Sequence, residues 1–197
     1  KDREKIHSVW EDIHFYGKST ELLYALPRSR NQAAILASYD AERSLATMSW
    51  FKLLIDKTQP KNAIEFGCGA GFLLEYINNV SPSIFLAGVD RLQNQVDLVP
   101  VSDHIKTYCC AYDDLKTNTE YDLAICDVGF DIADIPESLR SHKTEYIGEH
   151  PYYPNWSEDM QPFFHELLSP MKATLNKQGI LAFVGRLAGA TDIKALF

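Results

Sequence analysis

A glycine-rich loop between an expected strand and an expected helix constrains the fold more than any other sequence feature. The strand is expected over Ala63–Phe66 and the helix over Phe72–Val80. Between them, Gly67, Gly69 and Gly71 recur at two-residue spacing. Glycine accepts positive φ angles and lets the backbone approach a ligand closely, and a helix N-terminus adds free N–H groups and a positive dipole end. The stretch therefore predicts a ligand site at the carboxyl end of a strand in an α/β sheet.

Further apolar segments extend this pattern along the chain. They are short and separated by long or helical connections, which is typical of a parallel sheet covered by helices on both faces. These strands are expected over Ile84–Val89, Ile105–Cys110, Leu123–Cys126 and Ile180–Val184. Another helix is expected over Gln161–Asn176. We therefore expect an α/β fold with a Rossmann-like, doubly wound and mainly parallel sheet.

The first part of the chain is expected to be a helical extension, residues 1–60, packed on the sheet. Leu45, Met48 and Phe51 recur at helical spacing, and Pro60 ends that helix. Residues 61–197 would form the ligand-binding domain. The chain has 197 residues, so we expect the two parts to make one structural unit.

The composition is that of a globular chain, with 46% hydrophobic and 23% charged residues. No apolar run approaches the roughly 20 residues that span a bilayer, so we expect no membrane partner. The four cysteines lack the CxxC spacing of a metal site. Since the charged N-terminus lacks the apolar core of a signal peptide, we expect reduced thiols and a cytoplasmic location.

The net charge of −8 argues against a broad surface for binding a polyanion. The distribution is uneven: residues 1–62 carry ten Lys and Arg against eight Asp and Glu, whereas 63–197 carry nine against nineteen. The basic excess of the first part fits either an anionic substrate or an ordinary solvated helical surface.

The glycine loop closely resembles motif I of the class I S-adenosylmethionine (SAM) dependent methyltransferases. Glu65 stands two residues before the first glycine, as the acidic residue of that motif does. A dinucleotide-binding fingerprint would place its third glycine at position 72, where this chain has Phe72. The resemblance extends over about residues 60–187 and implies SAM as cofactor and S-adenosylhomocysteine (SAH) as product.

The same resemblance implies roles for residues at the ends of later strands. Asp90 matches the acid that binds the ribose hydroxyls, a task that suits a carboxylate because it accepts from both. Tyr112 and Asp113, or the residues one position earlier, match the pair that contacts adenine. Asp127 matches motif IV, faces the transferred methyl group and is the expected catalytic residue. The cofactor-binding set implied by the resemblance is Glu65, Gly67, Cys68, Gly69, Gly71, Asp90, Arg91, Tyr112, Asp113 and Asp127.

Methyl transfer requires mainly alignment of donor and acceptor, and a general base helps only a poorly nucleophilic acceptor. In this family the residues after motif IV, here 127–136, form the acceptor pocket. Aromatic residues and histidines follow, and they either line a pocket for a flat or cationic acceptor or cap the sheet edge. They are His142, Tyr146, His150, Tyr152, Tyr153, Trp156, Phe163, Phe164 and His165. The histidines are candidate bases, and their irregular spacing predicts no metal site.

A partial resemblance points to RNA cap methyltransferases of the flavivirus and FtsJ-like type, which use a Lys-Asp-Lys-Glu tetrad. Asp127 matches the Asp. The first Lys position falls near Thr47, with Lys52 the nearest lysine, and the second falls near Val184, two residues before Arg186. Arginine does not replace a lysine of tuned pKa, and the Glu position would lie beyond Phe197.

The leading hypothesis is a methyltransferase that acts on a small molecule or a protein-bound group. The alternatives are an RNA methyltransferase and, from another class, a non-catalytic scaffold or subunit with a SAM-binding fold. The family sheet has two more strands after the fifth. We expect these strands to be supplied by a segment outside this chain or by a partner, or the fold to be a variant, since an uncovered sheet edge invites pairing.

Overall fold

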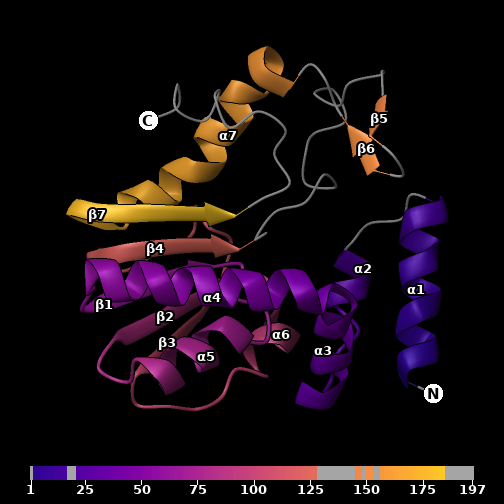
Figure 1. Ribbon diagram of the computed structural model, residues 1–197, viewed down its shortest axis with the longest axis horizontal. Coiled ribbons are helices and arrows are strands. Elements are labelled where there is room, and N and C mark those ends of the chain that lie inside the picture. The colour runs from indigo at the N-terminus through magenta and orange to yellow at the C-terminus, as the bar shows by residue number, and fades with distance from the viewer. Residues whose placement is uncertain (1, 17–20, 128–144, 148–149, 153–155, 185–197) are drawn as a thin grey trace.

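The computed structural model describes residues 2–16, 21–127, 145–147, 150–152 and 156–184 (Figure 1). Its centre is a five-stranded sheet with the order β3-β2-β1-β4-β7, and every neighbouring pair is parallel. The strands are β1 (Asn62–Phe66), β2 (Phe85–Asp90), β3 (Ile105–Cys109), β4 (Tyr121–Asp127) and β7 (Leu175–Val184). The predicted α/β fold with a parallel sheet is confirmed, and each predicted strand overlaps an observed one.

Helices precede the first strand and connect most of the later strands, and a short antiparallel hairpin forms a separate two-stranded sheet. The helices are α1 (Asp2–Tyr16), α2 (Glu21–Tyr24), α3 (Arg30–Ala37), the 3-10 turn η1 (Ser38–Asp40), α4 (Ala41–Thr58), α5 (Phe72–Val80), α6 (Gln93–Val96) and α7 (Trp156–Ala173). The hairpin consists of β5 (Glu145–Ile147) and β6 (His150–Tyr152). None of the helices in the described ranges is both long and apolar enough to cross a membrane.

The start of β7 differs from the prediction. The strand begins at Leu175 rather than Ile180, because Leu175 pairs with Tyr121 before a register shift in the ladder. Gly179 lies at this irregularity, where an added Cβ would come within 2.9 Å of the Tyr121 carbonyl oxygen. The predicted end of the preceding helix at residue 176 is also wrong, since α7 ends at Ala173 and Thr174 hydrogen-bonds back to Met171.

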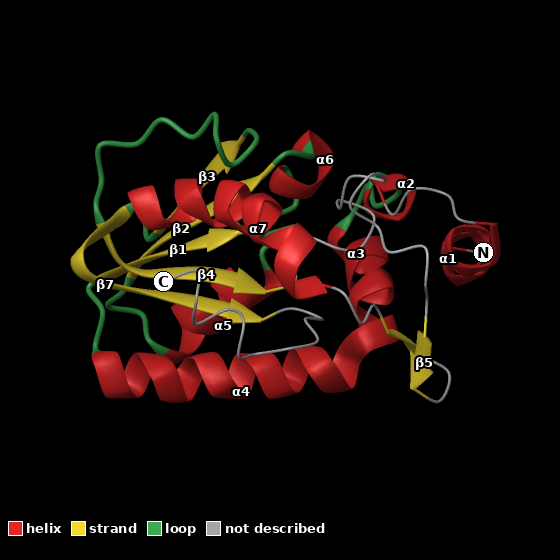
Figure 2. Ribbon diagram, turned by 90° about the horizontal axis from the view of Figure 1, so that it is seen from above, coloured by secondary structure: helices red, strands yellow, loops and turns green. Residues whose placement is uncertain are grey.

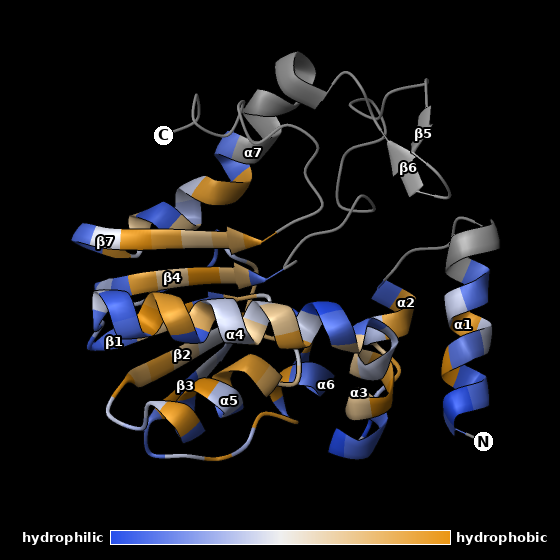
Figure 3. Ribbon diagram, viewed as in Figure 1, coloured by the Kyte–Doolittle hydropathy of each residue, from blue (hydrophilic) through white to orange (hydrophobic). Residues whose placement is uncertain are grey.

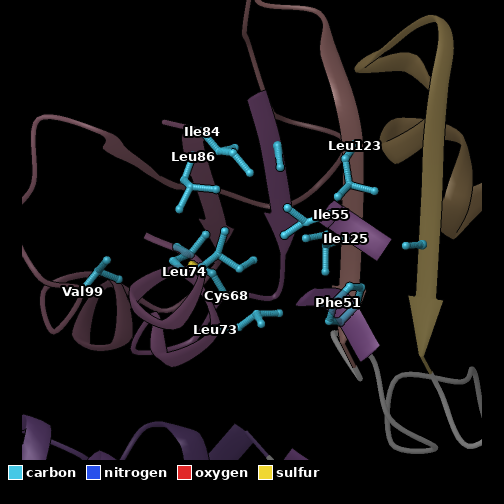
Figure 4. Close-up of a cluster of buried hydrophobic side chains, with 13 residues drawn as sticks. Phe51, Ile55, Cys68, Leu73, Leu74, Ile84, Leu86, Val99, Leu123 and Ile125 are labelled. Carbon is cyan, nitrogen blue, oxygen red and sulfur yellow. The ribbon is translucent and has the colours of Figure 1, made fainter. Parts of the chain in front are cut away.

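Apolar residues pack against both faces of the sheet. Figure 2 shows α4 and α7 on opposite sides of the strands. On the α4 and α5 side, the core is a cluster drawn in Figure 4 that includes Phe51, Ile55, Leu74, Leu86 and Ile125. On the α7 side, buried residues include Ile64, Phe66, Ala87, Leu168 and Met171. Burial on both faces explains why the strand sequences are nearly continuous apolar runs.

The helices α2 and α3 lie beyond the end of the sheet toward which β4 and β7 point (Figures 1 and 2). The Ser29 side chain caps α3 by accepting a hydrogen bond from the Gln32 N–H at 3.3 Å. The described part of α1, farther out, is mostly hydrophilic (Figure 3). The described helices α2 and α3 therefore stand at the carboxyl ends of the strands, where parallel sheets bind ligands.

Candidate functional site

The strand order reverses direction at the pair β1 and β4. The chain passes from β1 outward to β2 and β3 on one side, and from β4 to β7 on the other. At such a switch point the connections leave in opposite directions and open a crevice outside the carboxyl ends of the strands. The glycine loop and the strand-end residues Asp90 and Asp127 meet at this edge.

The glycine loop folds as the sequence predicts. Gly67, Gly69 and Gly71 have φ angles of 77°, 50° and 73°, a region that side chains other than glycine rarely adopt. The N–H groups of Gly67 and Cys68 donate to the Val89 carbonyl at 2.8 and 3.0 Å, which ties the loop to the end of β2. An added Cβ on Gly71 would lie 2.8 Å from Cγ1 of Val99, so this position excludes a side chain by space as well as by conformation.

Asp90 joins two loops through its carboxylate. Oδ2 accepts a hydrogen bond from the Gly69 N–H at 2.9 Å, and Oδ1 accepts one from the Leu92 N–H at 2.9 Å. Burial raises the pKa of Asp90, while the hydrogen bonds from Leu92 and Gly69 act in the opposite direction. Asp90 therefore holds the glycine loop and the turn after β2 at a fixed separation.

Glu65 is a buried carboxyl group next to the glycine loop. The residue is 4% exposed, and within the described ranges Oε2 has no hydrogen-bond partner. Burial raises the pKa of Glu65 well above its ordinary value, and the nearby carboxylates of Asp127 and Asp90 raise it further. A buried polar atom without a partner is costly, so its presence beside a ligand-type loop indicates a place where a ligand supplies the missing interaction.

Strand alternation explains why these carboxyl groups interact. In β1, Ala63 packs on the α4 and α5 side, and Glu65 two residues later points to the same side. The same reasoning places Asp90 with Leu86, and Asp127 with Ile125. Three neighbouring strands thus end in carboxyl groups on one face. They do not form a metal site, because no group of three such ligands close enough to hold a metal ion exists among the described residues.

Asp127 pairs with an arginine from the N-terminal extension. Nη1 of Arg43 donates to Oδ1 of Asp127 at 2.7 Å, and Nε of Arg43 donates to Asp40. Burial raises the pKa of Asp127, whereas the positive charge of Arg43 lowers it. Burial lowers the pKa of Arg43, but its contacts with Asp40 and Asp127 outweigh this and raise it. This pair links α4 to the carboxyl end of β4.

The other expected cofactor residues lie around this edge with different exposure. Cys68 is buried, and burial followed by the charge of Glu65 raises the pKa of its thiol well above normal. Tyr112 packs edge-on against Phe66, with ring centroids 5.4 Å apart, on the α7 side of the sheet. Asp113 is exposed. Arg91 lies 3.4 Å from Glu21 of α2.

Much of the expected acceptor region lies outside the described residues. This holds for residues 128–136, for Arg186, and for the side chains in 142–164. The exposed His165, on α7, lies with Nδ1 3.4 Å from the Ser169 hydroxyl.

Of the positions compared with the RNA methyltransferase tetrad, Thr47 is buried in α4 and Lys52 pairs with Asp56. Within the described ranges, the cation beside Asp127 is therefore an arginine, Arg43.

Comparison with known proteins gives structural matches only. Neither a family model nor a curated protein matches the sequence. The solved structure of the plantazolicin methyltransferase BpumL, in complex with a pentazolic desmethylPZN analog and SAH, matches with a TM-score of 0.50 at 16% identity. That match covers 78% of this chain and 52% of BpumL. The chain has the fold of the class I SAM-dependent methyltransferases.

Two other structures with this methyltransferase fold are also similar. The sugar N-methyltransferase KedS8 from a Streptoalloteichus species gives a TM-score of 0.49 at 13% identity, over 73% of this chain and 49% of KedS8. The N-methyltransferase NodS from Bradyrhizobium japonicum, in complex with SAH, gives 0.47 at 18% identity, over 72% and 60% of the two chains. The chain spans about half the length of the solved structures that it matches.

Two arginines that contact this site are not among the residues predicted from the sequence. Arg43 reaches Asp127 across 84 positions, and Arg30 reaches Ala70 of the glycine loop across 40. Both come from the helical extension, where basic residues are frequent. The one available signal was the basic excess of residues 1–62, and it did not single out either arginine.

Proposed function

We propose that the chain binds SAM at the glycine loop and transfers its methyl group to an acceptor at the end of β4. The observation that carries this proposal is the buried Glu65 carboxyl group, whose Oε2 has no hydrogen-bond partner among the described residues. It lies in β1 just before a loop with three positive-φ glycines, near Asp90 and Asp127. A cluster of carboxyl groups suits a cationic ligand. SAM carries a sulfonium and an ammonium group, and its amino-acid carboxylate can accept from the free N–H groups at the start of α5.

Each residue would contribute a distinct part of the cofactor site. Asp90 would accept from the ribose hydroxyls while it keeps its hydrogen bonds to the loops, since a carboxylate has lone pairs for several donors. Glu65 would face the positively charged end of the ligand. Tyr112 and Asp113 remain proposed adenine contacts, and Arg91, Cys68 and the three glycines complete the proposed set.

When bound, SAM supplies a methyl group already activated by a sulfonium leaving group. The protein then has to align an acceptor with it and exclude competing water. Asp127 would align the methyl acceptor by accepting a hydrogen bond from it. Arg43 would hold the Asp127 carboxylate in position. The contact with Arg43 occupies Oδ1 of Asp127, so Oδ2 is the oxygen that we assign to the acceptor.

We favour a small molecule or a protein-bound group as the acceptor. Two observations support this choice. The chain is acidic overall, and among the described residues the cation paired with Asp127 is Arg43, whereas RNA cap methyltransferases use lysines. BpumL, which has a similar fold, was solved in complex with a pentazolic desmethylPZN analog. We assign the reaction to a reducing compartment, the cytoplasm, since all four cysteines are free thiols.

The test is transfer of a radiolabelled methyl group from SAM to size-fractionated pools of metabolites, proteins and RNA. We expect label in the metabolite or protein pool, and a loss of at least tenfold in Asp127→Ala, because a hydrogen bond to a charged group typically contributes about 1.5–3 kcal/mol. The exposed Asp103→Ala is the matched control and should retain full transfer. Label confined to RNA supports the RNA alternative, and SAM binding without transfer to any pool supports a non-catalytic scaffold.

A further inference from the structure

One arginine of the N-terminal extension, Arg30, contacts the end of the glycine loop, the first turn of α5 and the connection after α6. Nη1 of Arg30, the first residue of α3, donates to the carbonyl oxygens of Ala70 and Leu98, the latter at 2.9 Å. Nη2 pairs with Glu75 in the first turn of α5. The guanidinium also lies over the Phe72 ring, 4.5 Å from its centroid. A planar guanidinium with donors in a fixed fork suits such a junction, whereas a lysine ammonium does not.

The contact with Ala70 fixes the orientation of a peptide group within the loop. The Ala70 carbonyl accepts from Arg30, and the N–H on the same peptide, that of Gly71, donates to the Cys68 carbonyl at 2.8 Å. Because a peptide group is planar, holding its C=O and its N–H at once fixes the plane. The Ala70–Gly71 peptide group, just before α5, therefore keeps one orientation.

The contact with Leu98 joins a second loop to the first. Leu98 lies in the connection after α6, and the next residue, Val99, packs against Gly71. Arg30 thus bridges the glycine loop after β1 and the connection after β2. These two segments lie on either side of Asp90, whose carboxylate binds both Gly69 and Leu92.

Side chains of α6 also donate hydrogen bonds to the N-terminal extension. The Asn94 side-chain amide donates to the carbonyl oxygens of Tyr24 and Pro27 at 3.1 and 3.2 Å, and the buried Gln95 amide donates to Tyr24 as well. Gln95 lies beside the loop, since its Oε1 would be 3.8 Å from a Cβ added to Gly69. Two independent sets of side-chain contacts therefore dock residues 21–37 on the loops of the site.

We propose that Arg30 is a positioning residue for the cofactor, and that docking of residues 21–37 through Arg30 completes the cofactor site. This inference rests on the proposed function, because it concerns the same glycine loop. The core domain would then bind SAM or SAH tightly only when α3 is docked. Arg30 does not act on the reacting atoms; it acts through the Ala70 peptide and the Leu98 carbonyl.

The experiment is calorimetric titration of the whole chain and its Arg30→Gln, Arg30→Lys and Arg28→Gln variants with SAH. We expect Arg30→Gln to weaken binding about tenfold, the effect of one lost hydrogen bond to a charged group. Arg30→Lys should recover part of this affinity through its charge. Arg28 hydrogen-bonds within its own segment, to Ala25 and Pro27, so Arg28→Gln should bind within about twofold of the unchanged chain.

The outcomes separate this inference from the proposed function. If the unchanged chain does not bind SAH, the proposed function is wrong and the role of Arg30 falls with it. If the chain binds SAH and Arg30→Gln binds equally well with a lower unfolding temperature, Arg30 is merely structural and the inference is overturned. Should Arg30→Gln fail to fold, hydrogen exchange of the unchanged chain decides: SAH should slow exchange in residues 30–37, and unaltered exchange there would contradict the proposal.

Discussion

The carboxylates at the ends of β2 and β4 are held in different ways. Asp90 accepts from the backbone N–H groups of Gly69 and Leu92, both in loops that begin at its own strand or the neighbouring one. Asp127 pairs instead with the side chain of Arg43, which is 84 positions away in α4. In the cofactor half of the site, the Asp90 carboxylate is thus held by local backbone groups, although the glycine loop beside it also contacts Arg30. In the half at β4, the Asp127 carboxylate itself depends on a long-range contact with the N-terminal extension.

This difference indicates how each half responds to substitution. A change in the cofactor half alters the loop itself and should weaken binding of SAM or SAH directly. A change in the Arg43 pair should leave the loop intact and alter only the charge and position of Asp127. Five substitutions test the two halves.

The largest effect is expected for Asp90→Ala. The variant loses hydrogen bonds to Gly69 and Leu92 and the proposed ribose contact, which together correspond to a roughly 100-fold weaker Kd for SAH. Calorimetric titration measures it, with Asp103→Ala as the exposed control. A Kd within threefold of the unchanged chain would mean that the β2 end is not the ribose site.

Gly71→Ala should also be severe, and Gly69→Ala should be mild by comparison. Both residues have positive φ, but an added Cβ at Gly71 would lie 2.8 Å from Val99, whereas at Gly69 the nearest atom is 3.8 Å away. We expect Gly71→Ala to lower the free energy of unfolding by about 2–4 kcal/mol and Gly69→Ala by about 1 kcal/mol, measured by urea denaturation. Adding Val99→Ala to Gly71→Ala should restore part of the loss; equal losses in the single variants would contradict the steric account.

Arg43→Gln tests the other half of the site. The Arg43 side chain is 33% exposed and that of Asp127 is 15% exposed, so removal of the cation leaves a mostly buried carboxylate unpaired. We expect the free energy of unfolding to fall by about 1–2 kcal/mol, less than for a fully buried pair. The Kd for SAH should stay within about threefold, because the glycine loop is untouched. Loss of SAH binding comparable to that of Asp90→Ala would remove the distinction between the two halves.

The smallest effect concerns pH. Burial raises the pKa of Glu65 in the folded chain well above its value in the unfolded chain, which is about 4.3. The folded state therefore retains this proton to higher pH, and its contribution to stability is lost as the pH rises through the folded pKa. Glu65→Gln cannot ionise, so its free energy of unfolding should fall less as the pH rises above the unfolded pKa of about 4.3.

Urea denaturation at several pH values without ligand measures this effect, with the exposed Glu42→Gln as control. Asp90 and Asp127 also have raised pKa values, so some slope should remain in Glu65→Gln. A slope identical to that of the unchanged chain would show that Glu65 does not carry the proton that we assign to it.

The parts of the fold and site that the sequence predicts are those with local causes. The apolar strand, the three glycines and the helix that starts at Phe72 follow from residue types a few positions apart, and the structure has this loop. Burial on both faces makes the strands recognisable as apolar runs. The polar start of β7, by contrast, was missed because residues 176–178 look like a turn, and only the Tyr121–Leu175 pairing extends the strand.

The contacts that dock the N-terminal extension could not be predicted in this way. Arg30 and Arg43 bind carbonyl and carboxylate oxygens that lie close only after the sheet has formed. Arginines on a helix usually face solvent, so their spacing carries no information about such partners. The same holds for Asn94 and Gln95, which reach α2 across about 70 positions.

The most direct test of the central claim is calorimetric titration of the whole chain with SAH, with NAD as the control ligand. We expect one site per chain with a micromolar Kd for SAH and no measurable heat with NAD, because Phe72 occupies the place of the third dinucleotide-binding glycine. Binding of NAD, or binding of SAH that survives unchanged in Asp90→Ala, would contradict the assignment of this edge of the sheet as a SAM site.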